Sequence, residues 1–477
     1  MAIYITKRQY LKKNSYLRNK ILISKMKNIK ILHLVLFYCL THLICSADSP
    51  INVSGKDAMS IGIYIEDLNS GNIILDYQSS KVYTPASVTK SLTAATALST
   101  LSSDFRFETP VYISGKIHNN ILFGDIIVYG IGDATLESMH FPENLGFCDS
   151  IANALKKNGI YQIEGSCRIK HKDFNIDCGI NPNWELEDIA WGYGTGLYPF
   201  NYKDNVFKLN INSKVTTQPN IADLTIHKLP SNGSNSIDLM RPFNSNDLFI
   251  IGNLNHQKGY SNTCSMPFPQ DVFIDELTAK LKESGIKLKQ EIIENSDNFG
   301  NKLIYTHKSP PLNDILKSLM VRSDNLFAES ILRVISTGKS LKNAINNELK
   351  IWEQRGLDIS FVTIRDGSGL SRTNRLSPKF LAKILKWMYN SPFQKSYINL
   401  FPRAGVNGTL KSFLKGTTLE GKLAMKTGSM NGVQCYAGYK INDSEEPTHI
   451  IVIMVNNFFC ERSTLKAEIE KLLLKNL

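Results

Sequence analysis

The chain has 477 residues, a formal net charge of +12 and 42% hydrophobic residues. This length exceeds one ordinary domain, so we expect two or three, with enough apolar residues for a sizeable core. Residues 1–47 hold nine Lys or Arg and no Asp or Glu, which leaves only +3 for residues 48–477. A nearly neutral body gives no electrostatic basis for nucleic-acid binding, so we exclude that class.

The N-terminal segment has the pattern of an export signal. Lys27 and Lys30 precede an apolar run from Ile31 to Ile44, and small residues follow up to Ala47. This order predicts a signal peptide within residues 1–47, with Met26 as the true start. The run is short for a membrane span, although an uncleaved anchor stays open as an alternative. We expect an exported protein with at most peripheral membrane association.

Residues with metal or cofactor chemistry are scattered through the rest of the chain. Six cysteines lie beyond the leader, none of them in a C-x-x-C pair, and the histidines form no cluster with zinc spacing. Cys148 with Cys167 or Cys178 is a candidate disulfide that the sequence leaves open. The glycines of Gly192–Gly196 lack the strand, helix and third spacing of a nucleotide-binding loop. We therefore predict no metal and no cofactor.

A β-hairpin opens the body of the chain. Ser60–Asp67 alternates like a strand, Leu68–Asn72 has turn chemistry, and Ile73–Tyr77 returns as the second strand. We expect this hairpin to belong to an antiparallel sheet.

The helix that follows carries the first candidate site residues. Apolar residues recur at helical spacing from Val88 to Leu98, and Pro85 suits the start of a helix. Ser87 should then lie in the first turn of a buried helix, where free N–H groups point outward. Lys90 comes one turn later on the same face.

Short strands and turns dominate residues 111–300, with helices expected at Ile151–Gly159 and Asp271–Gly285. We interpret residues 111–300 as an inserted segment of two small α/β or β-rich subdomains. Residues 48–110 and 301–477 would then form one core. The later part of this core is expected to contain helices near Leu312–Leu319 and Leu326–Leu332, strands at Lys422–Thr427, Val433–Ile441 and Thr448–Asn456, and a last helix at Arg462–Lys475. An α+β fold follows, with one antiparallel sheet built from both ends of the chain and flanked by helices.

Three short motifs occur in the contexts that these elements predict. They are Ser87-x-x-Lys90 at a helix start, Ser323-Asp324-Asn325 between two helices, and Lys426-Thr427-Gly428 in a late strand. Each motif alone also fits a structural role, as a helix cap, a turn or a solvated strand edge. All three in this order resemble the signature of penicillin-interacting serine enzymes.

That resemblance assigns chemical roles to five residues. Ser87 would attack a carbonyl carbon and form an acyl-enzyme. Lys90 can accept the proton only if it is neutral part of the time, and both burial and the second cation Lys426 would lower its pKa. Ser323 can relay the proton to the leaving amine, and Asn325 can orient Lys90 and the substrate amide. Which lysine or serine is the true base stays open.

The residues around the third motif would hold the substrate. Gly428 lets the substrate backbone lie close to the strand. Thr427 and Lys426 suit a substrate carboxylate. The backbone N–H groups of Ser87 and Ser429 would stabilise the oxyanion.

Further runs of sequence narrow the resemblance to one family. The long separation between Ser87 and Ser323 implies extra domains that β-lactamases and simple carboxypeptidases lack. Matching runs are Gly130–Leu136, Trp184–Asp188, Ser309–Leu312, Asp366–Arg372 and Ala404–Leu410. Over most of residues 55–460 the chain resembles the serine D-alanyl-D-alanine carboxypeptidase/endopeptidase family, the class C low-molecular-mass penicillin-binding proteins.

This resemblance implies a penicillin-binding/β-lactamase-like transpeptidase core with inserted smaller subdomains, in a periplasmic enzyme. Peptidoglycan stem peptides would be its substrates and β-lactams its inhibitors. Asp188 would face the amino end of a diamino acid in the stem, or else be a capping or salt-bridged aspartate. Arg372 and Asn431 would reach the cleft, or else form a loop salt bridge and a β-turn.

Two other functions stay open at this point. A β-lactamase or esterase of the same fold would turn over β-lactams quickly and would not need the inserted segment. A wall-binding protein with a dead site would not need both Lys90 and Lys426, so the intact motifs argue against it.

Overall fold

The structure is a computed structural model that describes residues 49–171, 179–212, 214–230, 236–253, 259–289, 301–336 and 340–477. The predicted leader and Cys178 lie outside the described residues. Residues Ile51–Leu477 form one compact unit. None of the helices in these described ranges is long and apolar enough to cross a membrane.

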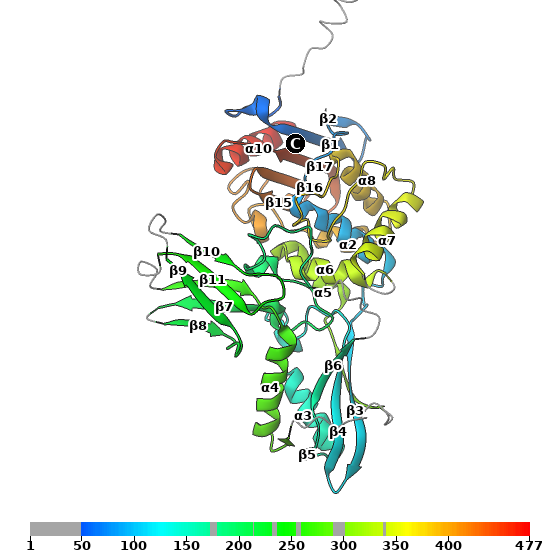
Figure 1. The fold of residues 1–477 in the computed structure, drawn as a ribbon. Helices are drawn as coiled ribbons and strands as arrows, with labels where there is room; N and C mark the ends of the chain where they lie inside the picture. The colour runs from blue at the N-terminus through cyan, green and yellow to red at the C-terminus, as the bar shows by residue number, and fades with distance from the viewer. Residues whose placement is uncertain are drawn as a thin grey trace, which may run out of the picture. The chain divides into compact units, whose positions relative to one another are not determined.

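A five-stranded antiparallel sheet joins the two ends of this unit, as Figure 1 shows. Its strands, in spatial order, are β15 (Leu423–Met430), β16 (Val433–Ile441), β17 (Pro447–Asn456), β1 (Ser60–Asp67) and β2 (Ile73–Tyr77). Ile63 of β1 pairs with Ile453 of β17. β1 is buried along most of its length because it is an inner strand with both faces covered. The predicted hairpin and the predicted sheet of early and late strands are confirmed.

Helices cover both faces of this sheet (Figure 1). α10 (Arg462–Asn476) packs Leu465 and Ile469 on one face, and α2 (Thr89–Thr100) and α8 (Pro378–Tyr389) lie on the other. α2 is apolar or small almost all round, which is why it occupies the middle of the core. The remaining helices on this side are α5 (Leu312–Arg322), α6 (Asn325–Val334), α7 (Leu341–Gln354) and α9 (Gln394–Asn399).

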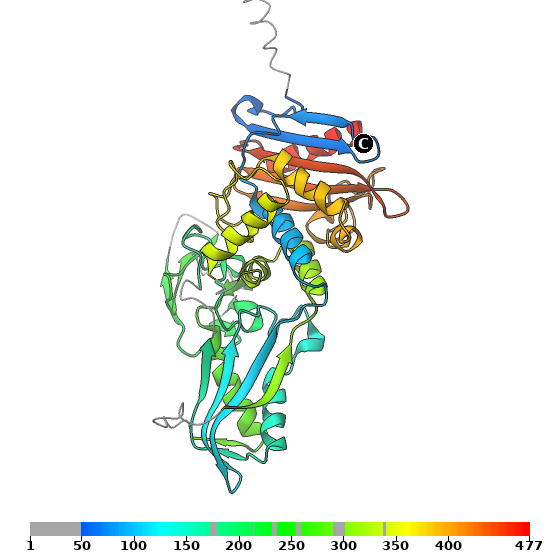
Figure 2. The ribbon, with the colours of Figure 1, turned by 90° about the vertical axis from the view of Figure 1, so that its right-hand side faces the viewer.

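Among the described residues, the inserted segment and the strands at its two boundaries form three further sheets with a hydrophobic core of their own. The largest consists of β3 (Glu108–His118), β4 (Ile121–Gly130), β5 (Gln162–Ile163), β6 (Cys167–His171), β13 (Lys287–Leu288) and β14 (Asn301–Lys308). The two smaller sheets consist of β7 (Val206–Ile211), β8 (Val215–Gln218) and β12 (Tyr260–Ser265), and of β9 (Thr225–Leu229), β10 (Ile237–Met240) and β11 (Asp247–Gly252). β3 and β14 lie side by side in Figure 2, so one antiparallel pair leads the chain out of the core and back.

In the described part of the inserted segment, the α-helices α3 (Phe147–Lys157) and α4 (Pro269–Glu283) pack against each other, and α3 also packs against β14. α3 begins four residues before the predicted start at Ile151. Its extra turn is capped from a distance, because the Glu137 carboxylate accepts hydrogen bonds from the backbone N–H groups of Gly146 and Phe147, each at 2.6 Å. A cap supplied by a separate segment is not visible in the local sequence.

Buried hydrogen bonds fix part of the inserted segment against the core. Trp184 Nε1 donates to Asp366 Oδ2 at 2.9 Å, and Ser330 Oγ on α6 donates to the carbonyl of Gly132 at 2.6 Å. The first of these bonds holds the segment just before Asp188 against the loop that contains Ser368, whose carbonyl accepts from Lys90 of the predicted site.

Candidate active site

Ser87 and Lys90 lie on consecutive turns at the start of α2. Ser87 is in a short 3-10 turn, Ala86–Val88, and Lys90 is in the first turn of the α-helix. Lys90 is fully buried, whereas Ser87 is partly exposed. Lys90 Nζ donates to Ser87 Oγ at 3.0 Å, to Asn325 Oδ1 at 2.6 Å and to the carbonyl of Ser368 at 2.5 Å. Three acceptors match the three protons of an ammonium group.

The turn between α5 and α6 delivers Ser323 and Asn325 to the same place. Ser323 ends α5 in a left-handed conformation (φ 62°), which side chains other than glycine seldom adopt. The Asp324 carboxylate then caps α6 by accepting from the N–H of Phe327 at 3.0 Å. Asn325 is the first residue of α6, and its Nδ2 donates to the carbonyl of Tyr193 at 2.8 Å.

Lys426 of the third motif is hydrogen-bonded to the second motif. Its Nζ donates to Ser323 Oγ at 2.8 Å and to the carbonyl of Thr427 at 2.8 Å. Lys90 contacts the first and second motifs and Lys426 contacts the second and third. The structure therefore unites the five residues that were predicted to be catalytic.

Gly428 allows β15 to lie against the Ser87 turn. A Cβ atom at Gly428 would lie 2.5 Å from the carbonyl oxygen of Pro85 and 3.1 Å from the backbone nitrogen of Ser87. Both neighbours are backbone atoms that cannot rotate away. A side chain at this position would push β15 away from the turn. Gly428 is therefore needed for a close contact between two parts of the protein's own backbone, besides the predicted contact with the substrate backbone.

Burial shapes the protonation of Lys90. Removal from water lowers the pKa of Lys90 to about 8, and the nearby carboxylates of Asp366, Glu329 and Asp324 oppose this shift. A lysine with this pKa is neutral in a sizeable fraction of molecules slightly above neutral pH. That is the condition for it to accept a proton from Ser87.

Lys426 has no such compensation. Burial lowers the pKa of Lys426 well below its usual value, and repulsion from Lys90 lowers it further. We expected this repulsion to lower the pKa of Lys90. The repulsion lowers the pKa of Lys426 instead, and carboxylates do not offset this shift.

A cleft of about 420 Å³ opens above these residues. Both the core and the inserted segment contribute to its lining: Ser87, Glu187, Asp188, Tyr193, Ser323, Asn325, Gly369, Leu370, Arg372, Ser429, Met430 and Asn431. Most of the predicted site residues therefore share one cleft. Lys90 and Lys426 lie beneath it, as their full burial requires.

Asp188 lies on the wall that the inserted segment contributes to this cleft. Burial raises the pKa of its carboxyl group, and the hydroxyl of Tyr193, which donates to Asp188 Oδ1 at 2.9 Å, opposes that shift. The carboxylate is half-buried and lines the cleft, so one part of it can meet a ligand. This placement fits the predicted contact with a charged amine.

Arg372 and Asn431 form the rim of the cleft together. Arg372 Nη1 donates to the carbonyl of Asn431 at 3.3 Å, and the guanidinium lies 3.9 Å from both Glu185 and Glu187. Asn431 is exposed in the turn between β15 and β16. The structure thus shows the loop ion pairs and the turn that were the alternative interpretations, and it also places both residues in the cleft.

Thr427 and Ser429 lie on one face of β15, two residues apart. Ser429 lines the cleft and also a second pocket, which Thr427 lines as well. The Oγ1 atoms of Thr427 and Thr409 are hydrogen-bonded at 2.7 Å. The predicted substrate contacts of the third motif are therefore divided between two adjacent cavities.

Sequence reasoning missed Tyr193 and Glu329. Tyr193 contacts both Asp188 and Asn325, as described above, but its only signal was its position five residues after Asp188. Glu329 is buried on α6, and its Oε1 accepts from the backbone N–H groups of Gly367 and Ser368, whose carbonyl holds Lys90. An acidic residue inside the apolar run Leu326–Leu332 was the available signal for Glu329.

Within the described ranges, no three His, Cys, Asp or Glu side chains come together as a group that could hold a metal ion. Cys148, Cys167, Cys264, Cys435 and Cys460 are free thiols in the structure. The candidate bridge from Cys148 to Cys167 is therefore not formed, and the alternative to Cys178 lies outside the described residues.

Comparison with known proteins extends over nearly the whole compact unit. A family model described as the D-Ala-D-Ala carboxypeptidase 3 (S13) family matches residues 53–474. D-alanyl-D-alanine carboxypeptidase DacB of Haemophilus influenzae is 27% identical over 412 residues, which cover 81% of this chain and 83% of that protein. Penicillin-sensitive carboxypeptidase A of Dictyostelium discoideum is 26% identical over 417 residues, 79% of this chain and 78% of that protein.

A solved structure gives the same result for the fold. The crystal structure of penicillin binding protein 4 (dacB) from Haemophilus influenzae matches with a TM-score of 0.75 at 25% identity, over 89% of this chain and 97% of that one. The predicted family and fold class are thereby confirmed. The chain belongs to the D-Ala-D-Ala carboxypeptidase 3 (S13) family and is a serine-type D-alanyl-D-alanine carboxypeptidase.

Proposed function

We propose that this carboxypeptidase is exported to the cell-wall compartment and acts on peptidoglycan stem peptides. It removes the terminal D-alanine or cleaves the D-alanyl cross-link between two stems, through an acyl-Ser87 intermediate. The observation that carries the proposal is the 3.0 Å hydrogen bond from buried Lys90 to Ser87 Oγ at the base of an open cleft. The basic leader and apolar run of residues 1–47 support export.

Lys90 is the base in the proposed acylation step. Neutral Lys90 takes the proton of Ser87 while Oγ attacks the carbonyl carbon of the scissile amide. The N–H groups of Ser87 and Ser429 bind the oxyanion that forms. Ser323, held by Lys426, relays this proton from Lys90 to the leaving amine as the C–N bond breaks, so that Lys90 is neutral again and Ser323 keeps its hydroxyl. Water then hydrolyses the ester and restores Ser87.

The proposed binding contacts divide the substrate between the walls of the cleft. Asp188 takes the free amine of the stem diamino acid, and Arg372 and Asn431 hold the stem backbone at the rim. Gly428 and Ser429 pair with the backbone near the scissile bond. Thr427 and Lys426 face the carboxylate of the residue that leaves.

β-Lactams are proposed inhibitors, since their strained amide presents the same carbonyl to Ser87. The relative from Dictyostelium discoideum has the name penicillin-sensitive carboxypeptidase A, which supports this extension. We also propose that residues 111–300 are a separate structural part that supplies the Asp188 wall. Their own hydrophobic core supports that division.

The test is mass spectrometry of residues 48–477 incubated with benzylpenicillin. We expect a stable mass increase of one drug molecule on a peptide that contains Ser87, and none in Ser87→Ala. Hydrolysed drug with unmodified protein would identify a β-lactamase instead. Intact drug with unmodified protein would contradict an active acylating site.

A further inference from the structure

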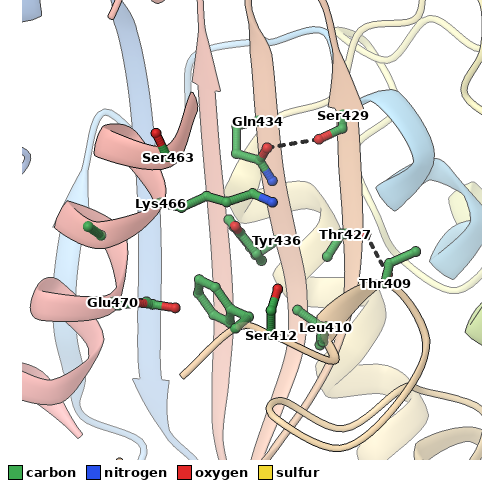
Figure 3. Close-up of a pocket in the computed structure, with 12 residues that line it drawn as sticks. Thr409, Leu410, Ser412, Thr427, Ser429, Gln434, Tyr436, Ser463, Lys466 and Glu470 are labelled. Carbon is green, nitrogen blue, oxygen red and sulfur yellow. Dashed lines mark hydrogen bonds between the residues drawn. The ribbon is translucent and has the colours of Figure 1, made fainter. Parts of the chain in front are cut away.

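A second pocket, with a volume of about 500 Å³, lies beside the cleft on the α10 face of the five-stranded sheet. Figure 3 shows its position between α10 and the edge strand β15, with Thr427 and Ser429 on one side and Lys466 reaching across the sheet from α10. The segment that contains Thr409 closes its lower side, and Tyr436 of β16 forms part of its floor. The proposed acylation of Ser87 uses no side chain of α10, which forms one wall of this pocket.

The pocket is continuous with the site through the third motif. Ser429 lines both cavities and is the one residue that their linings share. Thr427 follows Lys426 directly and faces the second pocket, where it is hydrogen-bonded to Thr409. The second pocket is not lined by three of the cleft residues, Asp188, Arg372 and Asn431. A substrate whose acyl part fills the cleft therefore leaves the second pocket free for the other side of its scissile bond.

One cation of the pocket, Lys466, is placed to meet a negatively charged group of a ligand. Lys466 forms no ion pair with any residue in the described part of the chain, and the Glu470 carboxylate accepts a hydrogen bond from the backbone N–H of Leu414 at 2.7 Å. Figure 3 shows Lys466 extended toward β16 and away from Glu470. Neither Lys466 nor Glu470 forms an ion pair among the described residues, and of the two charges only the Lys466 ammonium group extends over β16.

A buried hydroxyl provides a second, independent observation. Tyr436 is 1% exposed, and its hydroxyl makes no well-aligned hydrogen bond among the described residues, although the Gln434 side chain lies close to it. Its ring stacks on Phe413 at 4.7 Å between centroids, which fixes its direction. Buried hydroxyl groups nearly always have a good partner, so this one can gain a hydrogen bond when a ligand rearranges the pocket lining.

We propose that this pocket binds the leaving half of a cross-linked substrate, with Lys466 as the counter-ion of a carboxylate on that half. The inference rests on the proposed function, because it assumes acylation of Ser87 by a stem peptide. A released D-alanine needs space only for a methyl side chain. The leaving group of a cross-link is a larger amino acid that continues into a second, carboxylate-bearing stem, and only that group needs a cavity of this size.

The proposal concerns selectivity and adds no chemical step. The C–N bond still breaks after Ser87 attacks, and the leaving amine still takes its proton. Lys466 is a specificity-determining residue, because it lines the second pocket and not the cleft. Its effect should therefore appear in the ratio of two activities.

The experiment measures kcat/KM of the same preparation on a cross-linked muropeptide dimer and on a monomer that ends in D-alanyl-D-alanine. We expect Lys466→Ala to lower the dimer-to-monomer ratio about tenfold, the size expected for one lost charged contact. Lys466→Arg should restore most of the ratio. Lys475→Ala, an exposed lysine on the same helix, is the matched control and should leave the ratio unchanged.

The outcomes separate this inference from the function on which it rests. Equal losses on dimer and monomer, or no loss on either, would overturn the role of Lys466. Wild-type protein that releases D-alanine but does not cleave the dimer would overturn the pocket assignment and leave the carboxypeptidase intact. Wild-type protein that neither cleaves a substrate nor reacts with benzylpenicillin would overturn the proposed function itself.

Discussion

Lys90 is the residue on which the proposed chemistry depends most. Its pKa of about 8 results from burial, which favours the neutral amine, and from three carboxylates that oppose it. The balance keeps Lys90 protonated at low pH and frees it as a base when the pH rises through about 8. Glu329 belongs to this balance, because its own pKa is raised by burial to about 7 and its charge acts on Lys90.

The prediction at this scale is a rise of kcat/KM with pH, with a midpoint near 8 and a plateau above it. Neutral Lys90 is the active form, so activity is lost on the acidic side. Release of D-alanine measured between pH 6 and 10 would show the curve.

Glu329→Gln provides the control for this profile. It keeps a side-chain oxygen for the N–H groups of Gly367 and Ser368 but removes a negative charge near Lys90. The midpoint should therefore move to lower pH. A profile that stays flat from pH 6 to 9 in wild type would show that Lys90 is not the titrating base.

At the scale of elements, α2 is held from behind by α7. Glu348 of α7 is fully buried, and its Oε1 accepts from the Thr96 hydroxyl of α2 at 3.1 Å, while its other oxygen has no partner among the described residues. Burial raises the pKa of Glu348 to about 8. This carboxyl is therefore protonated in the folded protein at neutral pH and ionised in the unfolded chain.

The sign of the resulting effect follows from proton binding. Between the unfolded pKa of 4.5 and the folded value of about 8, the folded state binds the extra proton, so stability falls as pH rises. Glu348→Gln removes this loss because the amide is neutral in both states. We expect the variant to be more stable than wild type by at least ~1 kcal/mol at pH 8 and by little at pH 5.

Denaturant unfolding at both pH values would measure this difference. Glu353→Gln, an exposed change on the same helix, is the matched control and should have no effect at either pH. An equal gain for Glu348→Gln at pH 5 and pH 8 would argue for a packing effect in place of a protonation effect.

At the scale of the whole unit, the cleft exists because the inserted segment lies against the core. The hydrogen bond from Trp184 to Asp366 and that from Asn325 to the Tyr193 carbonyl join the two parts on either side of Asp188. Specificity for the stem peptide is therefore predicted to reside in the inserted segment, while the bond-breaking groups reside in the core.

Asp188→Asn tests this division of labour. Loss of the carboxylate should lower kcat/KM about tenfold for a stem peptide with a free amine on its diamino acid, because a charged hydrogen bond is worth ~1.5–3 kcal/mol. The same peptide with that amine acetylated should be affected much less. Steady-state kinetics on the two peptides gives the comparison, and an equal loss on both would assign Asp188 a structural role.

Much of this architecture could be read from local patterns. The alternation of apolar residues along Ser60–Asp67 predicts the strand that the structure contains. The glycine and proline residues around Ser87 and Gly428 mark its turns and close approaches. The sequence predicts the start of α3 four residues late, because the cap of this helix comes from Glu137 in a separate segment. Tyr193 was missed because its contact with Asn325 joins residues far apart in the chain.

The sequence by itself determined the three motifs, their order and the antiparallel sheet from both chain ends, because these depend on residue type and on short-range periodicity. Only the tertiary structure decided the state of Lys90 and Lys426, whose pKa values depend on burial and on charges brought from other elements. It also decided the pocket at Lys466, since α10 and β15 meet there only after the sheet has formed. Distances between side chains and removal from water are properties of the folded chain, and the chemistry of this site depends on both.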